Sequence, residues 1–340
     1  MADTRATPEA VMERLTAMAE DVLFPAAIET ERSDLIPVEL LDTLADAGFY
    51  GLAGPPDVGG AALPMDLAAR SIEIMAGACL STTFVWVQHH GVVLSVAFTA
   101  PPPLREQFLA RLCAGDVRAG IALAGALSGP VPMLRARRVE GGWALDGMSP
   151  WVTGWGLVDV LMVAARDDQD DLVWLLIDAE SSPTLRVEQR PMVALNATGT
   201  VALHVEGHLV PDERLIRTEP YAGFPERDAQ GLRLNGSLSL GVAGRCCDLI
   251  GPSPLDAELA ACRDALDRSP TEQMPAARAA ATELAGRASH TLIVAEGSSS
   301  ILADHHGQRL AREALFLLVF GSRPLIRASL LDRLGAPPAG

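Results

Sequence analysis

The sequence predicts an α+β multidomain fold with a helical N-terminal domain, a central antiparallel β-barrel or sandwich, and a C-terminal helical bundle. Three observations predict it. Helical periodicity extends from Pro8 to about Ala114. Short apolar runs at regular spacing replace it from Arg118, and helical signals return after Gln230. The predicted domains are residues 1–116, residues 117–210, and residues 211–340 as a linker followed by the bundle.

The composition is that of a folded, acidic protein. A chain of 340 residues with 49% hydrophobic content can bury a large core, and its net charge is −16. Because no Lys/Arg-rich run is present, neither a nucleic acid nor an anionic membrane is expected as a partner. No apolar run reaches the ~18 residues needed to span a bilayer. The N-terminus is acidic and helical in pattern, so the sequence predicts a cytoplasmic location.

The cysteines predict neither a disulfide framework nor a metal site. Their number, 5, is odd, Cys246 and Cys247 are adjacent, and no pair has the spacing of zinc ligands. Buried free thiols in a reducing compartment are therefore expected.

The N-terminal helices can be placed by their stop and start signals. Pro37 is expected in the first turn of a helix that stops at Gly48. The glycines and prolines from Gly51 to Gly60 predict a loop. Further helices are expected at residues 65–77, at 81–98, and from the Pro101–Pro103 break to Leu112.

The middle of the chain predicts strands at residues 118–125, 134–147, 158–166, 172–178 and 200–206. Within it, Trp143–Gly147 and Val158–Ala165 are predicted as a hairpin-like pair whose loop displays Trp151, Val152 and Thr153. Since indole is costly to leave wet and glycines flank it, the loop suits either a planar aromatic ligand or an ordinary β-core. A polar linker is predicted from Pro211 to Gln230. The last helices are expected at residues 231–251, 255–268, 274–303, 308–318 and 324–334.

Several motifs, taken in their order, resemble those of the acyl-CoA dehydrogenase superfamily. They are Ala47–Gly51 with Pro55–Gly60, Leu112–Asp116, Trp151–Thr153, and Asn196–Thr200 with Val210–Pro211. The resemblance covers nearly the whole chain. It implies an FAD-dependent oxidoreductase that introduces an α,β double bond into an acyl thioester.

The resemblance also implies where FAD would bind. An isoalloxazine ring needs one aromatic wall and a few polar groups at its rim. Trp151 would pack on the ring, with Val152 beside it, and Thr153 would contact the ring near N5. On the neighbouring strand, Leu123 and Ala124 take the place of a family segment that carries a threonine, so flavin contacts there must come from backbone amides. Ser128 either restores part of the polar character or is a solvent-facing turn serine.

The dinucleotide half of FAD is implied to lie at Gly297 and Ser298, where serines replace the glycines of the family segment. Serine hydroxyls and backbone amides can hold a pyrophosphate. In the family this segment reaches a neighbouring subunit, which implies a homodimer or homotetramer.

The base that removes the α-proton is not evident. A carboxylate in an apolar pocket would suit this role because burial raises its pKa. The usual position is occupied by Phe320, and an alternative position falls on Leu232–Arg233. Glu296 and Glu313 are weak candidates, and a structural ion pair is the favoured interpretation of Glu313.

Two other functions therefore stay open. One is a base-less supporting subunit in a heteromer with a catalytic paralogue. The other is a flavin-dependent monooxygenase, which needs no α-proton base. Adjacent His89 and His90 are interpreted as helix histidines, at most one of which faces a pocket.

Overall fold

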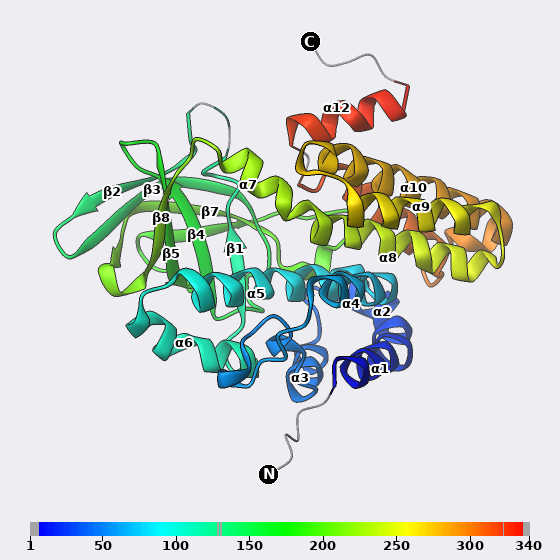
Figure 1. Ribbon diagram of the computed structural model, residues 1–340, viewed down its shortest axis with the longest axis horizontal. Coiled ribbons are helices and arrows are strands. Elements are labelled where there is room, and N and C mark those ends of the chain that lie inside the picture. The colour runs from blue at the N-terminus through cyan, green and yellow to red at the C-terminus, as the bar shows by residue number, and fades with distance from the viewer. Residues whose placement is uncertain (1–6, 128, 130, 322, 336–340) are drawn as a thin grey trace.

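The structure is a computed structural model that describes residues 7–127, 129, 131–321 and 323–335. Figure 1 shows a twisted sheet at the left, a bundle of C-terminal helices at the right, and the N-terminal helices below both. The N-terminal helices are α1 (Pro8–Met18), α2 (Phe24–Arg32), α3 (Val38–Asp46), α4 (Met65–Ala78), α5 (Leu80–Thr99) and α6 (Pro102–Ala114). As predicted, α3 follows Pro37 and stops before Gly48, which takes the left-handed conformation with φ of 76°.

Within the described residues, the central part is one sheet of eight strands in the order β6-β7-β3-β2-β4-β5-β8, with β1 beside β4. The strands are β1 (Ala119–Ala122), β2 (Leu134–Val139), β3 (Gly142–Val152), β4 (Val160–Arg166), β5 (Asp171–Asp178), β6 (Leu185–Gln189), β7 (Val201–Pro211) and β8 (Leu215–Pro220). Most pairs are antiparallel, but β1 and β2 both pair with β4 in parallel. The sheet is thus mostly antiparallel, as predicted, and two parallel pairings make it mixed.

The predicted pairing of the two strands on either side of Trp151 was wrong. The predicted strand 134–147 is itself a hairpin, because Gly141 adopts φ of 75° and turns β2 back into β3. β3 pairs with β2 and β7, whereas β4 pairs with β1 and β5. Trp151 and Val152 thus belong to the end of β3, and Thr153 follows it.

The predicted linker from Pro211 to Gln230 is mostly regular structure. β8 pairs with β5, and α7 (Phe224–Gln230) follows it. Pro211 and Pro220 are the last residues of β7 and β8, where a missing N–H costs the sheet little. The sheet therefore extends to Pro220.

The C-terminal helices confirm the predicted ones within a few residues. They are α8 (Leu232–Ile250), α9 (Pro254–Arg268), α10 (Met274–Glu296), α11 (His306–Val319) and α12 (Pro324–Arg333). α10 ends earlier than predicted because Gly297, with φ of 75°, opens the short 3-10 turn η7 (Gly297–Ile301). Among the helices of the described residues, none has the length and apolar character of a transmembrane span.

α5 connects the three parts of the molecule. Its residues contribute to the core shared by the N-terminal and C-terminal helices, and to the apolar layers on the sheet. α4 crosses α8 closely, since a Cβ added at Gly241 would lie 2.3 Å from the carbonyl oxygen of Glu73. The five cysteines are free thiols, four of them buried, as expected.

Candidate functional site

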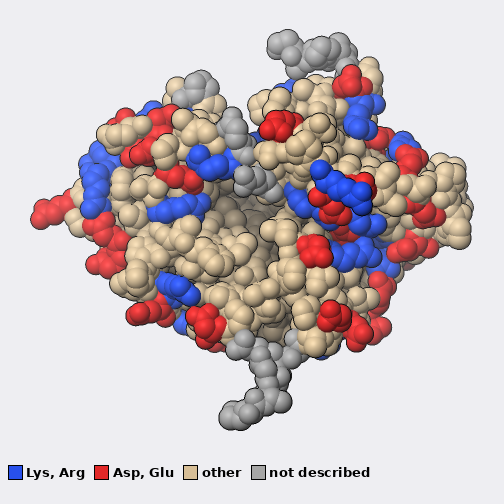
Figure 2. All heavy atoms as spheres, in the orientation of Figure 1, with Lys and Arg blue, Asp and Glu red and all other residues tan. Residues whose placement is uncertain are grey.

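Trp151 and Val152, predicted at the flavin ring, form the end of β3 beside Val85 of α5, and Thr153 follows them. Figure 2 shows that the molecular surface is hollowed between the β-domain and the C-terminal helices. We use the name domain junction for the segments that the contacts described below bring together. It comprises residues 151–156, residues 191–200, the N-terminal half of α5, and residues 313–321 at the end of α11.

Trp151 leaves its indole in solvent, while its neighbours are covered. The residue is 58% exposed, whereas Val152 is fully buried and Thr153 is 7% exposed. Gly154 follows with φ of 96°, and a Cβ added there would lie 3.8 Å from Cγ1 of Val85 on α5. An exposed indole beside a glycine turn gives a flat ligand an apolar wall with room to approach it.

The hydroxyl of Thr153 belongs to a row of threonines. Its Oγ1 lies 3.2 Å from Oγ1 of Thr200, which lies 2.9 Å from Oγ1 of Thr198. Thr198 in turn donates a hydrogen bond of 2.7 Å to the carbonyl oxygen of Leu195. Thr198 and Thr200 were predicted only as parts of a motif, because their sequence positions do not reveal a contact with Thr153.

The other predicted flavin contacts are on the turn after β1. Leu123 and Ala124 are half-buried there, and Ala124 offers no hydroxyl. The amide of Gly125 donates to Oγ of Ser149 at 3.3 Å. Ser128, also predicted at this site, lies outside the described residues.

The serine turn predicted for the dinucleotide uses most of its hydroxyls internally. Ser299 donates to the carbonyl oxygen of Glu296, and buried Ser300 donates to those of Ile293 and Gly297. Gly297 and Ser298 are exposed. Only the exposed backbone and Ser298 are therefore suited to an anion in this turn, which packs on α10 and α11.

The position predicted for a base is part of an aromatic cluster. The Phe320 ring lies 4.7 Å from that of Phe84 and 5.7 Å from that of Phe316, and Phe84 also contacts Phe316 at 5.0 Å. Phe84 of α5 packs in this aromatic cluster, whereas the next residue, Val85, belongs to the same buried cluster as Val152. Two consecutive residues of α5 therefore contact the two parts of the domain junction. The carbonyl oxygens of Leu317 and Phe320 accept hydrogen bonds from Arg278. Arg278 was not singled out from the sequence.

Phe316 also lines an apolar groove of about 380 Å³ between the β-domain and α11. Its walls are Pro191, Met192, Val193, Ala194, Leu315, Phe316 and Val319. Arg312 fixes one edge, because its guanidinium donates to the carbonyl oxygen of Val193 at 2.8 Å. The same loop leads to Leu195 and the threonine row, so the groove belongs to the domain junction.

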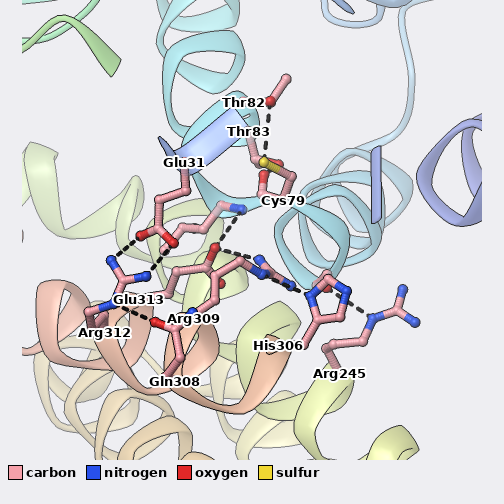
Figure 3. Close-up of polar contacts among 12 residues, drawn as sticks. Glu31, Cys79, Thr82, Thr83, Arg245, His306, Gln308, Arg309, Arg312 and Glu313 are labelled. Carbon is pink, nitrogen blue, oxygen red and sulfur yellow. Dashed lines mark hydrogen bonds and ion pairs between the residues drawn. The ribbon is translucent and has the colours of Figure 1, made fainter. Parts of the chain in front are cut away.

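Glu313 lies on α11 beside Arg309 (Figure 3), and Phe316 follows it one turn later in the same helix. Glu313 is 1% exposed, and its Oε1 accepts from Arg309 at 2.6 Å and from the amide of Leu80 at 3.4 Å. Burial raises the pKa of Glu313 to about 7, against the opposing charge of Arg309. Its partner is thus Arg309, while neighbouring Arg312 pairs with Glu31 at 2.6 Å.

The remaining candidates are less well placed. Glu296 lies near the serine turn, with its Oε2 3.4 Å from Nδ1 of His305. That nitrogen accepts from the amide of Gly307, so it has no hydrogen to give the carboxylate. Leu232 is buried, and Arg233 pairs with Glu73 and Asp267.

The two adjacent histidines on α5 have different environments. His89 is buried between the carbonyl oxygen of Leu112 and the amide of Ala119. Burial lowers its pKa to about 3, so it is a neutral structural residue. His90 packs edge-on against Trp86, and its ring nitrogens are inaccessible to solvent.

Comparison with known proteins agrees with this architecture. The family model described as acyl-CoA dehydrogenase, N-terminal domain, matches residues 6–116. A 3-sulfinopropanoyl-CoA desulfinase of Variovorax paradoxus is 26% identical over 247 residues, which are 68% of this chain and 62% of the relative. A benzylmalonyl-CoA dehydrogenase of Aromatoleum aromaticum is 24% identical over 250 residues, which are 69% of this chain and 64% of the relative.

A solved structure has nearly the same fold. A glutaryl-CoA dehydrogenase of Mycobacterium smegmatis in complex with FADH2 superimposes with a TM-score of 0.78 at 18% identity, over 98% of this chain and 95% of the other. The helical N-terminal part, mixed central sheet and C-terminal helices therefore define the acyl-CoA dehydrogenase fold. The chain is thus similar to acyl-CoA dehydrogenases, because residues 6–116 match the N-terminal domain model and the whole chain has the fold of the solved structure. It spans less than two thirds of the length of the curated relatives named above.

Proposed function

We propose that the chain is an FAD-dependent oxidoreductase of the acyl-CoA dehydrogenase type that acts on an acyl thioester. The observation that carries the proposal is the exposed indole of Trp151 beside the hydroxyl of Thr153 at the domain junction. The match of residues 6–116 to the acyl-CoA dehydrogenase N-terminal domain and the flavin in a structural neighbour support the choice of FAD. Bound FAD would supply the hydride acceptor.

The residues present fit the ring end of this cofactor better than its dinucleotide end. Trp151 supplies the apolar wall, and the backbone near Leu123 and Ala124 supplies polar groups without side-chain hydroxyls. At Gly297 and Ser298 only exposed backbone and one free hydroxyl are available, because Ser299 and Ser300 bond within their own turn. We therefore expect the dinucleotide to need a second chain, in a homodimer or homotetramer.

Within the part of the chain that the structure describes, the domain junction has no carboxylate placed to remove the α-proton of an acyl thioester. Phe320 cannot take a proton, and the aromatic cluster of Phe84, Phe316 and Phe320 keeps the position apolar. Glu313 is engaged by Arg309 and by the first turn of α5. This observation favours a second candidate function, a supporting subunit that assembles with a catalytic paralogue.

The deciding measurement is the visible absorption spectrum of the purified protein, followed by anaerobic mixing with acyl-CoAs of different chain lengths. Bleaching of a bound flavin supports dehydrogenation. A flavin that is retained but stays oxidised contradicts dehydrogenation by this chain alone and favours monooxygenase chemistry. Failure to bind flavin favours the supporting subunit.

Phe320→Glu provides a matched test of the missing base. It places a carboxylate at the position where the family generally has one, in an apolar surrounding that should raise its pKa. If the base alone is missing, this variant should bleach its flavin with an acyl-CoA at least ~100-fold faster than the unaltered chain, the scale of a positioned base. In the control, Phe320→Gln, glutamine has nearly the shape of glutamate but no charge, so the flavin should not bleach faster than in the unaltered chain.

A further inference from the structure

The threonine row at the domain junction has a fixed direction of hydrogen bonding. Thr198 donates to the carbonyl oxygen of Leu195, which cannot donate in return. A hydroxyl carries one hydrogen, so Thr198 must accept from Thr200 across their 2.9 Å contact. Thr200 has then used its own hydrogen and must accept from Thr153 across 3.2 Å. The hydrogen of Thr153 therefore points inward.

The backbone holds this row in place. Leu195 and Gly199 have positive φ values, of 56° and 60°, which turn the segment that carries Thr198 and Thr200 toward Thr153. A Cβ added at Gly199 would lie 2.4 Å from the carbonyl oxygen of Trp155, so the turn needs glycine. Amides of Gly154 and Trp155 donate to the carbonyl oxygens of Thr198 and Gly199, at 2.9 Å and 3.0 Å.

Because the three threonines are buried, water does not compete for their hydroxyls and change the direction of the hydrogen bonds. Thr198 is fully buried, Thr200 is 5% exposed and Thr153 is 7% exposed. The Leu195 carbonyl oxygen, which is the last acceptor of the row, also accepts from the Thr198 amide at 3.1 Å. This second hydrogen bond holds the oxygen in place. If the row ran the other way, Thr198 would donate to Thr200, and its oxygen would face the Leu195 carbonyl oxygen at 2.7 Å with no hydrogen between them, which is costly in a buried place.

We propose that Thr198 and Thr200 are positioning residues that make Thr153 a hydrogen-bond acceptor toward the ligand at the domain junction. The inference rests on the proposed function in one respect, that the flavin ring edge at N5 faces Thr153. Oxidised flavin has no hydrogen on N5, whereas fully reduced flavin carries one. The row therefore favours the reduced cofactor and raises its reduction potential.

Thr200→Val tests the direction of this effect. Valine keeps the shape but removes the acceptor of the Thr153 hydrogen, which is then free to donate to N5 of oxidised flavin. We expect oxidised FAD to bind about tenfold more tightly relative to reduced FAD, the effect of one hydrogen bond. The midpoint potential then falls by about 30 mV for a two-electron couple. Thr198→Val should shift the potential in the same direction, because Thr200 can then donate to Thr153.

The matched control is Thr291→Val, since Thr291 is an exposed threonine whose hydroxyl bonds to Arg287 of its own helix. The midpoint potential of the flavin in Thr291→Val should equal that in the unaltered protein. The potentials are measured by reductive titration of the flavin absorbance, and thermal unfolding of each variant is followed in parallel.

Affinity for 5-deaza-FAD gives a second readout, since its ring has a C–H in place of N5. The unaltered protein should bind oxidised FAD and 5-deaza-FAD with similar affinity, whereas Thr200→Val should favour FAD about tenfold. Flavin that is bound with an unchanged potential in Thr200→Val overturns the inference and leaves the proposed function standing. An unaltered chain that retains no flavin, alone or with its partner subunits, overturns the proposed function and the inference with it.

Discussion

Trp151 is a large apolar side chain that the protein itself leaves 58% exposed, next to a fully buried valine. If its indole stacks on a ligand ring, Trp151→Ala should weaken flavin retention by about 1–3 kcal/mol, the usual range for a large aromatic contact. The dissociation constant, measured by flavin fluorescence, should then rise about 5- to 150-fold. Trp151→Phe should lose less, because a smaller ring still covers part of the flavin.

The free energy of unfolding of Trp151→Ala is the control for this prediction. Because the indole is mostly in solvent, Trp151→Ala should change the free energy of unfolding by less than about 1 kcal/mol. Flavin affinity that is the same in both proteins would contradict the stacking role. A large loss of stability would instead assign the indole to the core.

Glu296 and Glu313 are the carboxylates that could act as a displaced base. Glu313 is bonded to Arg309, and Glu296 lies beside His305 near the serine turn, outside the domain junction. Glu296→Gln and Glu313→Gln should therefore each keep the rate of flavin bleaching by an acyl-CoA within a few-fold. A fall of ~100-fold or more in one variant, the scale expected for a general base, would identify that residue as the base.

The end of α11 depends on a residue from α10. Arg278 is fully buried and donates to the carbonyl oxygens of Leu317 and Phe320, at 3.2 Å and 2.8 Å. It also donates to Thr282 at 2.6 Å and to Asn235 at 2.8 Å. A cation at a helix C-terminus satisfies carbonyls that have no partner within the helix. Arg278 therefore fixes the position of Phe320.

Arg278→Met should lower the free energy of unfolding by about 2–4 kcal/mol, because several buried acceptors lose their donor at once. Chemical denaturation measures this directly. Arg287→Met is the control, since Arg287 is half-exposed and pairs with Glu258 and Glu283. It should cost under about 1 kcal/mol. Equal losses in the two variants would show that Arg278 is not a cap.

Elements with local signals could be predicted from the sequence, and pairings between distant segments could not. Pro37 and Gly48 delimit α3 as expected because each acts within one helical turn. The second partner of β3 is β7, whose paired residues run from Val201 opposite Val152 to Pro211 opposite Gly142, and apolar alternation does not specify so distant a partner. β8 was hidden by the polar character of an edge strand next to Pro211 and Pro220.

At the scale of the whole molecule, the candidate site joins segments from all three parts of the chain. The Trp151–Thr153 motif was found by its resemblance to a family. Its contact with Thr200, and the meeting of Phe84 with Phe320, depend on how the domains pack. Arg278 and Thr198 are ordinary residues in the sequence, and only burial and hydrogen-bond geometry give them a role.

The buried pair between α11 and α5 should make the stability of the whole protein depend on pH. Burial raises the pKa of Glu313 from its ordinary value of 4.5 to about 7. Between these values the unfolded chain releases a proton that the folded chain keeps, so the free energy of unfolding falls as pH rises. Above about pH 7 both states are ionised, and the loss stays constant.

Glu313→Gln removes this titration and should abolish its share of the pH dependence. Relative to the unaltered protein, the variant should gain roughly 2–3 kcal/mol of unfolding free energy between pH 5 and pH 8. Taking the difference between the two proteins cancels the opposite effect of His89, whose pKa burial lowers. Glu283→Gln, at a partly exposed pair with Arg287, should gain less than about 1 kcal/mol over the same range. Parallel pH profiles for Glu313→Gln and the unaltered protein would show that Glu313 is ionised in the folded state throughout, held by Arg309.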